Sequence, residues 1–178
     1  PDGNTPIRFI VYGDSETEPE STGKFTTWVD PVNDSVRLYL TDQTTGYKNN
    51  LEVIRSREPD LVFIAGDLVE TGGEQRDWDE FWRHNTGSNS ELSLAGNIPL
   101  MAALGNHEYY EGSQLDRYNQ PGSERAVKRF LTYFESPPNN SPDPEREGRY
   151  YSLKYGPATF IVLDVCNNEM NKSGDDTN

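Results

Sequence analysis

The pattern that most restricts the fold of this chain is an apolar run that ends in glycine followed by aspartate or asparagine. It occurs three times, in FIVYGD, FIAGD and MAALGN, and places Asp14, Asp67 and Asn106 directly behind a glycine. Short, continuous apolar runs rich in β-branched and aromatic residues are typical of buried parallel strands. The sequence therefore predicts three buried strands, at 7–12, 61–65 and 98–104, that end in the same way.

The segment between the first two runs decides how these strands are arranged. Apolar side chains recur there at helical spacing, at Tyr47, Leu51 and Ile54. Pro59 then stops the helix, because proline cannot donate the backbone hydrogen bond that would continue it. A strand, a helix and a second strand form a parallel pair, so Asp14 and Asp67 should emerge at the same edge of one sheet.

Three further elements complete the predicted α/β fold. A second helix follows the glycines at 72 and 73 and carries Trp78, Phe81 and Trp82, and a third follows Ser123 and carries Val127, Phe130, Leu131 and Phe134. A hairpin over 149–165 turns at Gly156 and Pro157. We expect a helix-poor surface insertion at 18–40 and a surface loop at 137–145. Because no repeat or linker divides the chain, residues 1–178 are predicted to belong to a single domain.

Composition limits the classes of partner. The net charge of −14, with 16 Lys and Arg scattered along the chain, argues against a nucleic-acid partner, because such binders neutralise phosphates. An anionic substrate would need a strong local positive charge, and a divalent metal is the obvious source; a merely acidic, soluble surface explains the charge equally well. No run reaches the roughly 20 apolar residues of a membrane helix. The compartment stays undecided, with secretion or the periplasm slightly favoured.

The single cysteine excludes two other kinds of site. One thiol, Cys166, can form neither a disulfide framework nor a thiolate metal site. Because it stands in an apolar run, it is predicted to be a small buried side chain.

The three strand ends themselves indicate a binding site. Ligands of open α/β sheets bind beyond the carboxyl ends of the strands, where Asp14, Asp67 and Asn106 would gather. Their hard oxygen atoms, together with the imidazole of His107, suit divalent first-row metals. An alternative is that Asp14 and Asp67 only cap the helices that follow.

The motifs GDSE, GDLVETGG and GNHEYY, at their spacing in this chain, resemble the first three motifs of the calcineurin-like metallophosphoesterases, purple acid phosphatases included. The resemblance covers residues 7 to about 165. It implies a two-layered β-sandwich flanked by helices, with two metal ions at the strand ends. The metals expected from it are Mn, Fe, Zn or similar ions, and the substrate is a phosphate ester.

The resemblance also assigns roles to residues. Asp14 would bind the first metal, Asp67 would bridge both, and Asn106 would bind the second through its amide oxygen. His107 would face the substrate beside Asn106 and protonate the leaving alkoxide, or stabilise the charge that develops on it. Two such cations lower the pKa of a bridging water and polarise the phosphoryl oxygens.

Several positions depart from the family pattern or stay open. Glu16 stands where the first motif normally has histidine, so it is either a metal ligand or a solvent-facing charge. Glu70 replaces the tyrosine of purple acid phosphatases, which argues against a coloured iron site. Glu70 and Glu108 are interpreted as surface charges or as groups that support the ligands. Tyr109 is expected either to line the substrate pocket or to pack in the core.

The histidine count leads to the last expectation. The family supplies further histidine ligands after the third motif, whereas this chain has two histidines, and His84 is predicted to be structural or exposed. We therefore expect residues 1–178 to be the front part of a longer domain whose C-terminal part is missing here. The leading hypothesis is a metal-dependent phosphohydrolase. A degenerate, non-catalytic binding or scaffold domain is the alternative, and a DNA nuclease is disfavoured by the charge.

Overall fold

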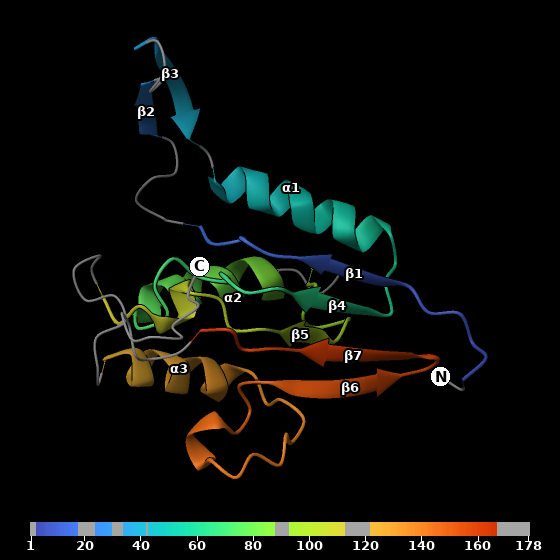
Figure 1. The fold of residues 1–178 in the computed structure, drawn as a ribbon. Coiled ribbons are helices and arrows are strands. Elements are labelled where there is room, and N and C mark those ends of the chain that lie inside the picture. Colours follow the sequence, from blue (N-terminus) through green and yellow to red (C-terminus); the bar gives the residue numbers. More distant parts are fainter. Residues whose placement is uncertain are drawn as a thin grey trace.

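A computed structural model describes residues 3–17, 24–29, 34–41, 43–87, 93–112 and 122–166. At its centre lies a parallel sheet of three strands, β1 (Phe9–Tyr12), β4 (Leu61–Ile64) and β5 (Leu100–Ala102), with β4 in the middle. Phe9 pairs with Leu61, and Val62 pairs with Leu100. The three predicted strands therefore form one sheet, and their carboxyl ends share one edge (Figure 1).

Helices cover one face of this sheet. Helix α1 (Gln43–Ser56) joins the β1 half of the chain to β4 and buries the predicted stripe of Tyr47, Leu51 and Ile54. This stripe packs with Val62 and Leu94, and with the partly buried Ile10 and Leu100. The helix ends three residues before Pro59. Its position above β1 confirms the predicted strand–helix–strand unit (Figure 1).

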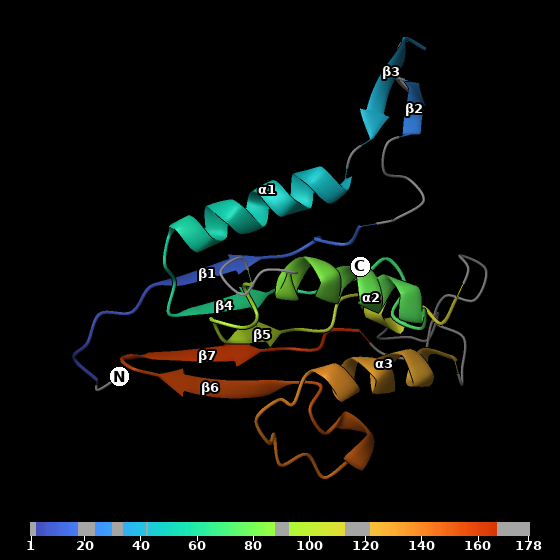
Figure 2. The same ribbon diagram turned by 180° about the vertical axis from the view of Figure 1, so that it is seen from behind.

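A hairpin of β6 (Tyr151–Tyr155) and β7 (Ala158–Val162) covers the opposite face. The ring of Phe160 lies 4.5 Å from that of Phe63 and 5.0 Å from that of Phe9, measured between centroids. The Tyr151 hydroxyl donates a hydrogen bond of 2.9 Å to the Ala102 carbonyl. The hairpin therefore forms a second layer, with α1 on the other side of the parallel sheet and α3 (Gly122–Tyr133) beside the hairpin, in agreement with the predicted α/β fold (Figure 2).

The two other helices hold an aromatic core beyond the strand ends. Helices α2 (Gln75–Thr86) and α3 (Gly122–Tyr133) occupy the positions expected for them. Trp78 is fully buried, and its indole N–H donates to the Gly72 carbonyl at 2.8 Å. The remaining buried aromatic and sulfur-containing side chains of this cluster are Phe81, Tyr109, Phe130, Phe134 and Cys166. The prediction that Cys166 is buried is therefore confirmed.

The insertion at 18–40 contains a hairpin that the sequence did not predict. Strands β2 (Lys24–Val29) and β3 (Val36–Thr41) pair in antiparallel fashion and project away from the central sheet (Figure 1). The loop at 137–145 lies on the surface and leads into a short 3-10 turn, η3 (Pro144–Arg146). None of the helices in the described residues is long and apolar enough to cross a membrane.

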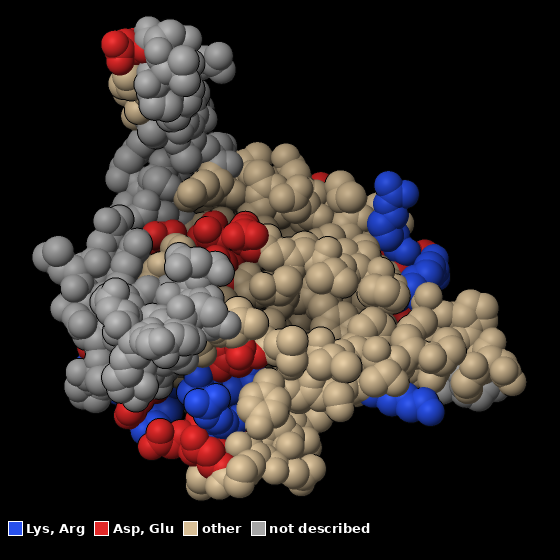
Figure 3. All heavy atoms as spheres, in the orientation of Figure 1, with Lys and Arg blue, Asp and Glu red and all other residues tan. Residues whose placement is uncertain are grey.

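An exposed apolar row follows the outer side of β7. Ile161, Leu163 and Val165 are 71%, 62% and 57% exposed, whereas Phe160 and Val162 point inward. This alternation is what a strand with one buried face requires, but the outward residues are apolar rather than polar. We call Ile161, Leu163 and Val165 the outer β7 row. In the view of Figure 3, uncharged side chains cover most of the described surface, and Asp and Glu side chains lie near the middle of the view as well as at its margin.

Candidate active site

The three strand ends meet in direct backbone contact. The Asp14 N–H donates to the Gly66 carbonyl at 3.3 Å, and the Ser15 N–H donates to the Asp67 carbonyl at 2.9 Å. A Cβ atom placed on Gly66 would lie 2.7 Å from the Cα of Gly105, which is closer than real Cβ contacts. Gly66 also has a φ of +96°, so both space and conformation require glycine here. The segments that carry Asp14, Asp67 and Asn106 therefore lie side by side.

Both aspartates adopt a left-handed backbone conformation. The φ angle is 49° at Asp14 and 52° at Asp67, two of five described residues other than glycine with positive φ. Such conformations are uncommon for side chains larger than hydrogen, and they cluster at functional sites. The same strain at two strand ends points to a site in which the position of the carboxylates matters.

His107 is fixed by three neighbours. Its backbone N–H donates to Asp67 Oδ1 at 3.0 Å. Its ring Nδ1 lies 2.7 Å from the Glu70 carbonyl oxygen, which can only accept, so Nδ1 carries the proton. The Tyr110 ring lies 4.6 Å from the imidazole ring. With Nδ1 held in this way, Nε2 is the ring atom that can exchange a proton with a ligand.

Asn106 is oriented through its amide nitrogen. Nδ2 donates to the Tyr110 hydroxyl at 2.7 Å, which leaves Oδ1 as the atom that can bind a cation. Tyr110, rather than Tyr109, is therefore the tyrosine that touches a candidate ligand.

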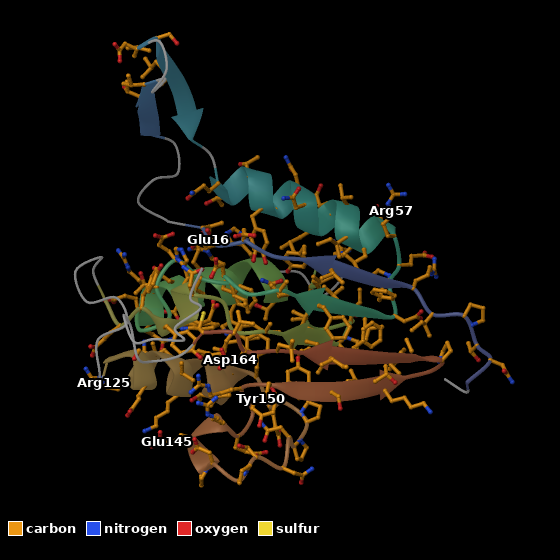
Figure 4. The ribbon with its side chains drawn as sticks, in the orientation of Figure 1. Glu16, Arg57, Arg125, Glu145, Tyr150 and Asp164 are labelled. Atoms are coloured by element: carbon orange, nitrogen blue, oxygen red, sulfur yellow. The ribbon has the colours of Figure 1, made fainter. Side chains whose placement is uncertain are left out.

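Glu16 lies half-buried behind Asp14. Burial raises the pKa of its carboxyl above the usual range, as do the charges of Asp67 and Asp14, while His107 acts in the opposite direction. Its Oε2 is buried and has no hydrogen-bond partner among the described residues. A buried, unpartnered carboxylate oxygen near two other carboxylates fits a bound cation, because a positive charge would compensate all three. Figure 4 shows Glu16 beyond the end of β1, on the side of α1.

The described residues nevertheless supply few side chains that could bind a metal ion. Within them, no three side chains of His, Cys, Asp or Glu lie close enough together to hold a metal ion. Any cation bound here would use Asn106 Oδ1, and water or backbone oxygens, in addition to the carboxylates.

Glu108 is completely buried between two of the strand ends. Its carboxylate accepts hydrogen bonds from the N–H groups of Gly105, Leu68, Asp67 and Val69, at 2.7, 2.8, 3.0 and 3.4 Å. Burial raises its pKa to about 7, against the lowering effect of the backbone N–H donors. The interpretation of Glu108 as a surface charge is wrong.

Tyr109 does not lie where a substrate could touch it. Its side chain is fully buried in η1 (His107–Tyr109), and its hydroxyl donates to Asp164 Oδ2 at 2.7 Å. Arg149 joins both groups, with Nε 2.7 Å from Asp164 Oδ2 and Nη2 2.5 Å from the Tyr109 hydroxyl. The structure supports core packing for Tyr109 and not the substrate contact that was also considered.

His84 also lies away from the strand ends, on α2. Its Nε2 pairs with Glu80 Oε1 at 2.8 Å, and its ring contacts that of Tyr47. Burial, followed by the positive charges of Arg83 and Lys48, lowers the pKa of His84. These contacts match the structural role predicted for it.

A cleft of about 490 Å³ opens beside the candidate ligands, between the end of β1 and α1. Asp14 and Glu16 line one wall, and Gln43 and Asn50 of α1 line the other. The described lining residues include no lysine or arginine. The cleft is therefore acidic but also has apolar lining residues, among them Val53 and Ile54, and it is large enough for a small organic group.

Comparison with known proteins gives two findings. The profile of a family described as calcineurin-like phosphoesterase matches residues 7–176. Two curated proteins of Mycobacterium tuberculosis, the uncharacterized proteins MT2654 and Rv2577, are each 28% identical to the chain over 175 residues. The match covers 93% of this chain but 28% of each relative, so the chain spans little more than a quarter of the length of these proteins.

Proposed function

The chain belongs to the calcineurin-like phosphoesterase family, and from this premise we propose that it carries part of the active site of a metal-dependent phosphohydrolase of phosphate mono- or diesters. The observation that carries the proposal is the meeting of Asp14, Asp67, Asn106 and His107 at one edge of the sheet. Three oxygen donors and one proton donor on adjacent strand ends are the groups that metal-assisted phosphoryl transfer uses.

The cation ligands follow from the free oxygens of the site. Asp14 and Asp67 offer carboxylates on adjacent segments, Asn106 offers Oδ1, and Glu16 offers the buried Oε2 that lacks a partner among the described residues. We assign Asp67, the central residue of the three strand ends, to the position between two cations. When bound, two ions such as Mn, Fe or Zn would lower the pKa of a water and polarise the phosphoryl oxygens.

His107 supplies the proton. Its Nδ1–H is anchored on the Glu70 carbonyl, so the ring keeps one orientation and presents Nε2 to the ester. For this step the ring must be the imidazolium, which carries a second proton on Nε2. Delivery of that proton to the departing alkoxide oxygen neutralises the charge that develops as the phosphorus–oxygen bond breaks, and the neutral ring keeps its proton on Nδ1.

The cleft beside Asp14 and Glu16 would receive the alcohol part of the ester. Its described walls carry amides and carboxylates and no cationic side chain, so they favour a neutral or cationic alcohol over a polyanionic one. Substrates with several phosphates are therefore not expected to place a second phosphate in this cleft.

The test is hydrolysis by the protein in its full natural length. The metal-loaded protein should hydrolyse p-nitrophenyl phosphate or bis(p-nitrophenyl) phosphate, a chelator should abolish turnover, and Mn²⁺ or Zn²⁺ should restore it. Absence of turnover with both esters and all tested metals would overturn the proposal.

A non-catalytic binding or scaffold domain is the second candidate, and the short donor set of the described residues favours it. Such a domain would bind inorganic phosphate or a phosphate ester, detected by calorimetry, without hydrolysing the ester.

A further inference from the structure

Glu108 connects two loops that carry candidate metal ligands. We propose that Glu108 is a positioning residue that holds Asp67 and Asn106 in place before any cation binds. The inference deepens the proposed function and rests on it for the identity of the ligands. It concerns a side chain that touches neither substrate nor metal.

The two carboxylate oxygens of Glu108 divide their contacts between the loops. Oε1 accepts from Leu68 at 2.8 Å and from Val69 at 3.4 Å, both in the loop after β4. Oε2 accepts from Asp67 at 3.0 Å and from Gly105 at 2.7 Å, so this single atom joins the loop after β4 to the loop after β5. Asp67 directly follows Gly66, and Gly105 directly precedes the candidate ligand Asn106. Movement of Glu108 would therefore separate the two loops.

These N–H groups need Glu108 as an acceptor because they lie beyond the ends of the strands, where no neighbouring strand accepts their hydrogen bonds. Backbone N–H groups that are buried without an acceptor destabilise a fold, because they have lost their hydrogen bonds to water and gained none in the protein. The chain turns sharply at Gly66 and adopts the left-handed conformation at Asp67, so no neighbouring strand can accept from Asp67 and Leu68. A carboxylate with two oxygens satisfies the donors of both loops at once.

A return contact makes the connection reciprocal. Asp67 Oδ1 accepts the backbone N–H of His107, while Glu108 Oε2 accepts the backbone N–H of Asp67. Each loop therefore donates an N–H to a carboxylate of the other. These two contacts together fix the backbone of Asp67 and the backbone at the start of η1. They therefore orient the side chains of both Asp67 and His107.

The loop at 70–74 closes the space behind Glu108. The Gly72 N–H donates to the His107 carbonyl at 3.0 Å, and the Gly73 N–H donates to the Tyr110 carbonyl at 2.7 Å. A Cβ atom on Gly72 would lie 2.7 Å from the Cα of Glu108. Glu108 has no exposed surface, and both its oxygens are occupied by N–H donors, so it acts through the loops rather than as a ligand.

The decisive variant is Glu108→Gln, which keeps the shape of the side chain but replaces one acceptor oxygen by an NH₂ group. Whichever way the amide turns, either Asp67 and Gly105 or Leu68 and Val69 face a donor instead of an acceptor. In the metal-free protein, hydrogen exchange should accelerate by about 10–100-fold at the pair of amides that faces the NH₂ group, either Asp67 and Gly105 or Leu68 and Val69. The affinity for Mn²⁺, measured by calorimetry, should fall by about 10–100-fold.

Glu80→Gln is the matched control. Glu80 is also buried, but it pairs with His84 and Arg83 on α2, away from the strand ends. This variant should lower Tm yet leave the exchange of the Asp67 and Gly105 amides and the Mn²⁺ affinity as in the parent. Unchanged exchange in Glu108→Gln at both pairs of amides, Asp67 with Gly105 and Leu68 with Val69, would overturn the inference.

The parent protein provides a test that does not depend on a folded variant. Its Asp67 and Gly105 amides should exchange slowly without metal, and fast exchange there would contradict the role of Glu108. Mn²⁺ binding separates the two proposals. A parent that binds no metal would overturn the proposed function, whereas equal Mn²⁺ affinities of parent and Glu108→Gln would overturn only the role of Glu108.

Discussion

Each residue at the strand ends uses one polar atom for orientation and keeps another for chemistry. His107 holds Nδ1 against the Glu70 carbonyl and keeps Nε2. Asn106 gives Nδ2 to Tyr110 and keeps Oδ1, and Asp67 gives Oδ1 to the His107 backbone and keeps Oδ2. A substitution at these positions therefore changes both the orientation and the chemistry of the site unless it keeps the first atom of the pair.

Replacement of His107 by alanine removes the proton donor. Under the proposed mechanism, turnover should fall by roughly 10²–10⁴-fold, the usual loss for a general acid. Metal content, measured by elemental analysis, should hardly change, because the backbone N–H that bonds Asp67 is retained. An unaltered rate would remove His107 from the mechanism.

Substitution of Asp67 or Asp14 by asparagine tests the assignment of the bridging ligand. The side-chain amide oxygen in Asp67→Asn can still accept the His107 N–H, but the negative charge between the two cations is lost. Asp67→Asn should therefore reduce the occupancy of both metals, whereas Asp14→Asn should reduce mainly one. Two full equivalents in both variants, determined by mass spectrometry of metals, would show that the bridging assignment is wrong.

At the scale of elements, the periodicity of the sequence predicted those helices and turns that depend on local spacing and on contacts with a single neighbouring element. The stripe Tyr47, Leu51 and Ile54 and the turn at Gly156 follow from spacing and backbone preference, and both appear where expected. The hairpin β2–β3 was not predicted, although Val36, Leu38 and Leu40 of β3 alternate with more polar side chains as in a half-buried strand.

In the candidate site, too, some features follow from the sequence pattern and others depend on contacts between distant residues. The convergence of Asp14, Asp67 and Asn106 follows from parallel topology alone. The sequence left two interpretations of Glu108 open, a surface charge or a group that supports the ligands, because its burial depends on N–H donors some 40 residues away that no local pattern reveals. The choice between core packing and substrate contact for Tyr109 depended on its hydrogen bond to Asp164, which lies 55 residues later in the sequence.

The network of Arg149, Asp164 and Tyr109 ties the β6–β7 hairpin to η1. The Arg149 and Asp164 side chains are 8% and 3% exposed, and they approach to 2.7 Å. Arg149→Met would leave the Asp164 carboxylate buried and uncompensated, so the free energy of unfolding should fall by roughly 3–5 kcal/mol. Urea denaturation measures this loss.

The double variant Arg149→Met with Asp164→Leu is the control for that loss. It removes both charges together, so it should recover much of the stability. A loss below about 1 kcal/mol in the single variant would mean that the ion pair contributes little to holding the hairpin.

At the scale of the whole molecule, the surface combines a net charge of −14 with the outer β7 row. We propose that further protein covers this row and supplies a histidine and a His-x-His pair as additional metal ligands. Exposed, contiguous apolar side chains on a strand favour association. The 178-residue chain expressed alone should therefore associate, bind metal weakly and hydrolyse little.

Analytical ultracentrifugation checks the association. Ile161→Lys with Leu163→Lys should shift the chain toward monomer, whereas Val53→Lys, at a similarly exposed apolar position of α1, should not. A monodisperse monomer that holds two metals and turns over substrate would contradict the proposal that further ligands are needed.

The left-handed backbone at Asp14 has a consequence for how substitutions are selected. Asp14 is exposed, and glycine would adopt its φ of 49° with less strain, so Asp14→Gly should raise the stability of the metal-free protein by up to ~1 kcal/mol. A library of variants ranked by folding alone should thus favour glycine at this position. The same library ranked by catalysis should retain aspartate, and the positions at which the two rankings disagree would outline the active site without any knowledge of its substrate.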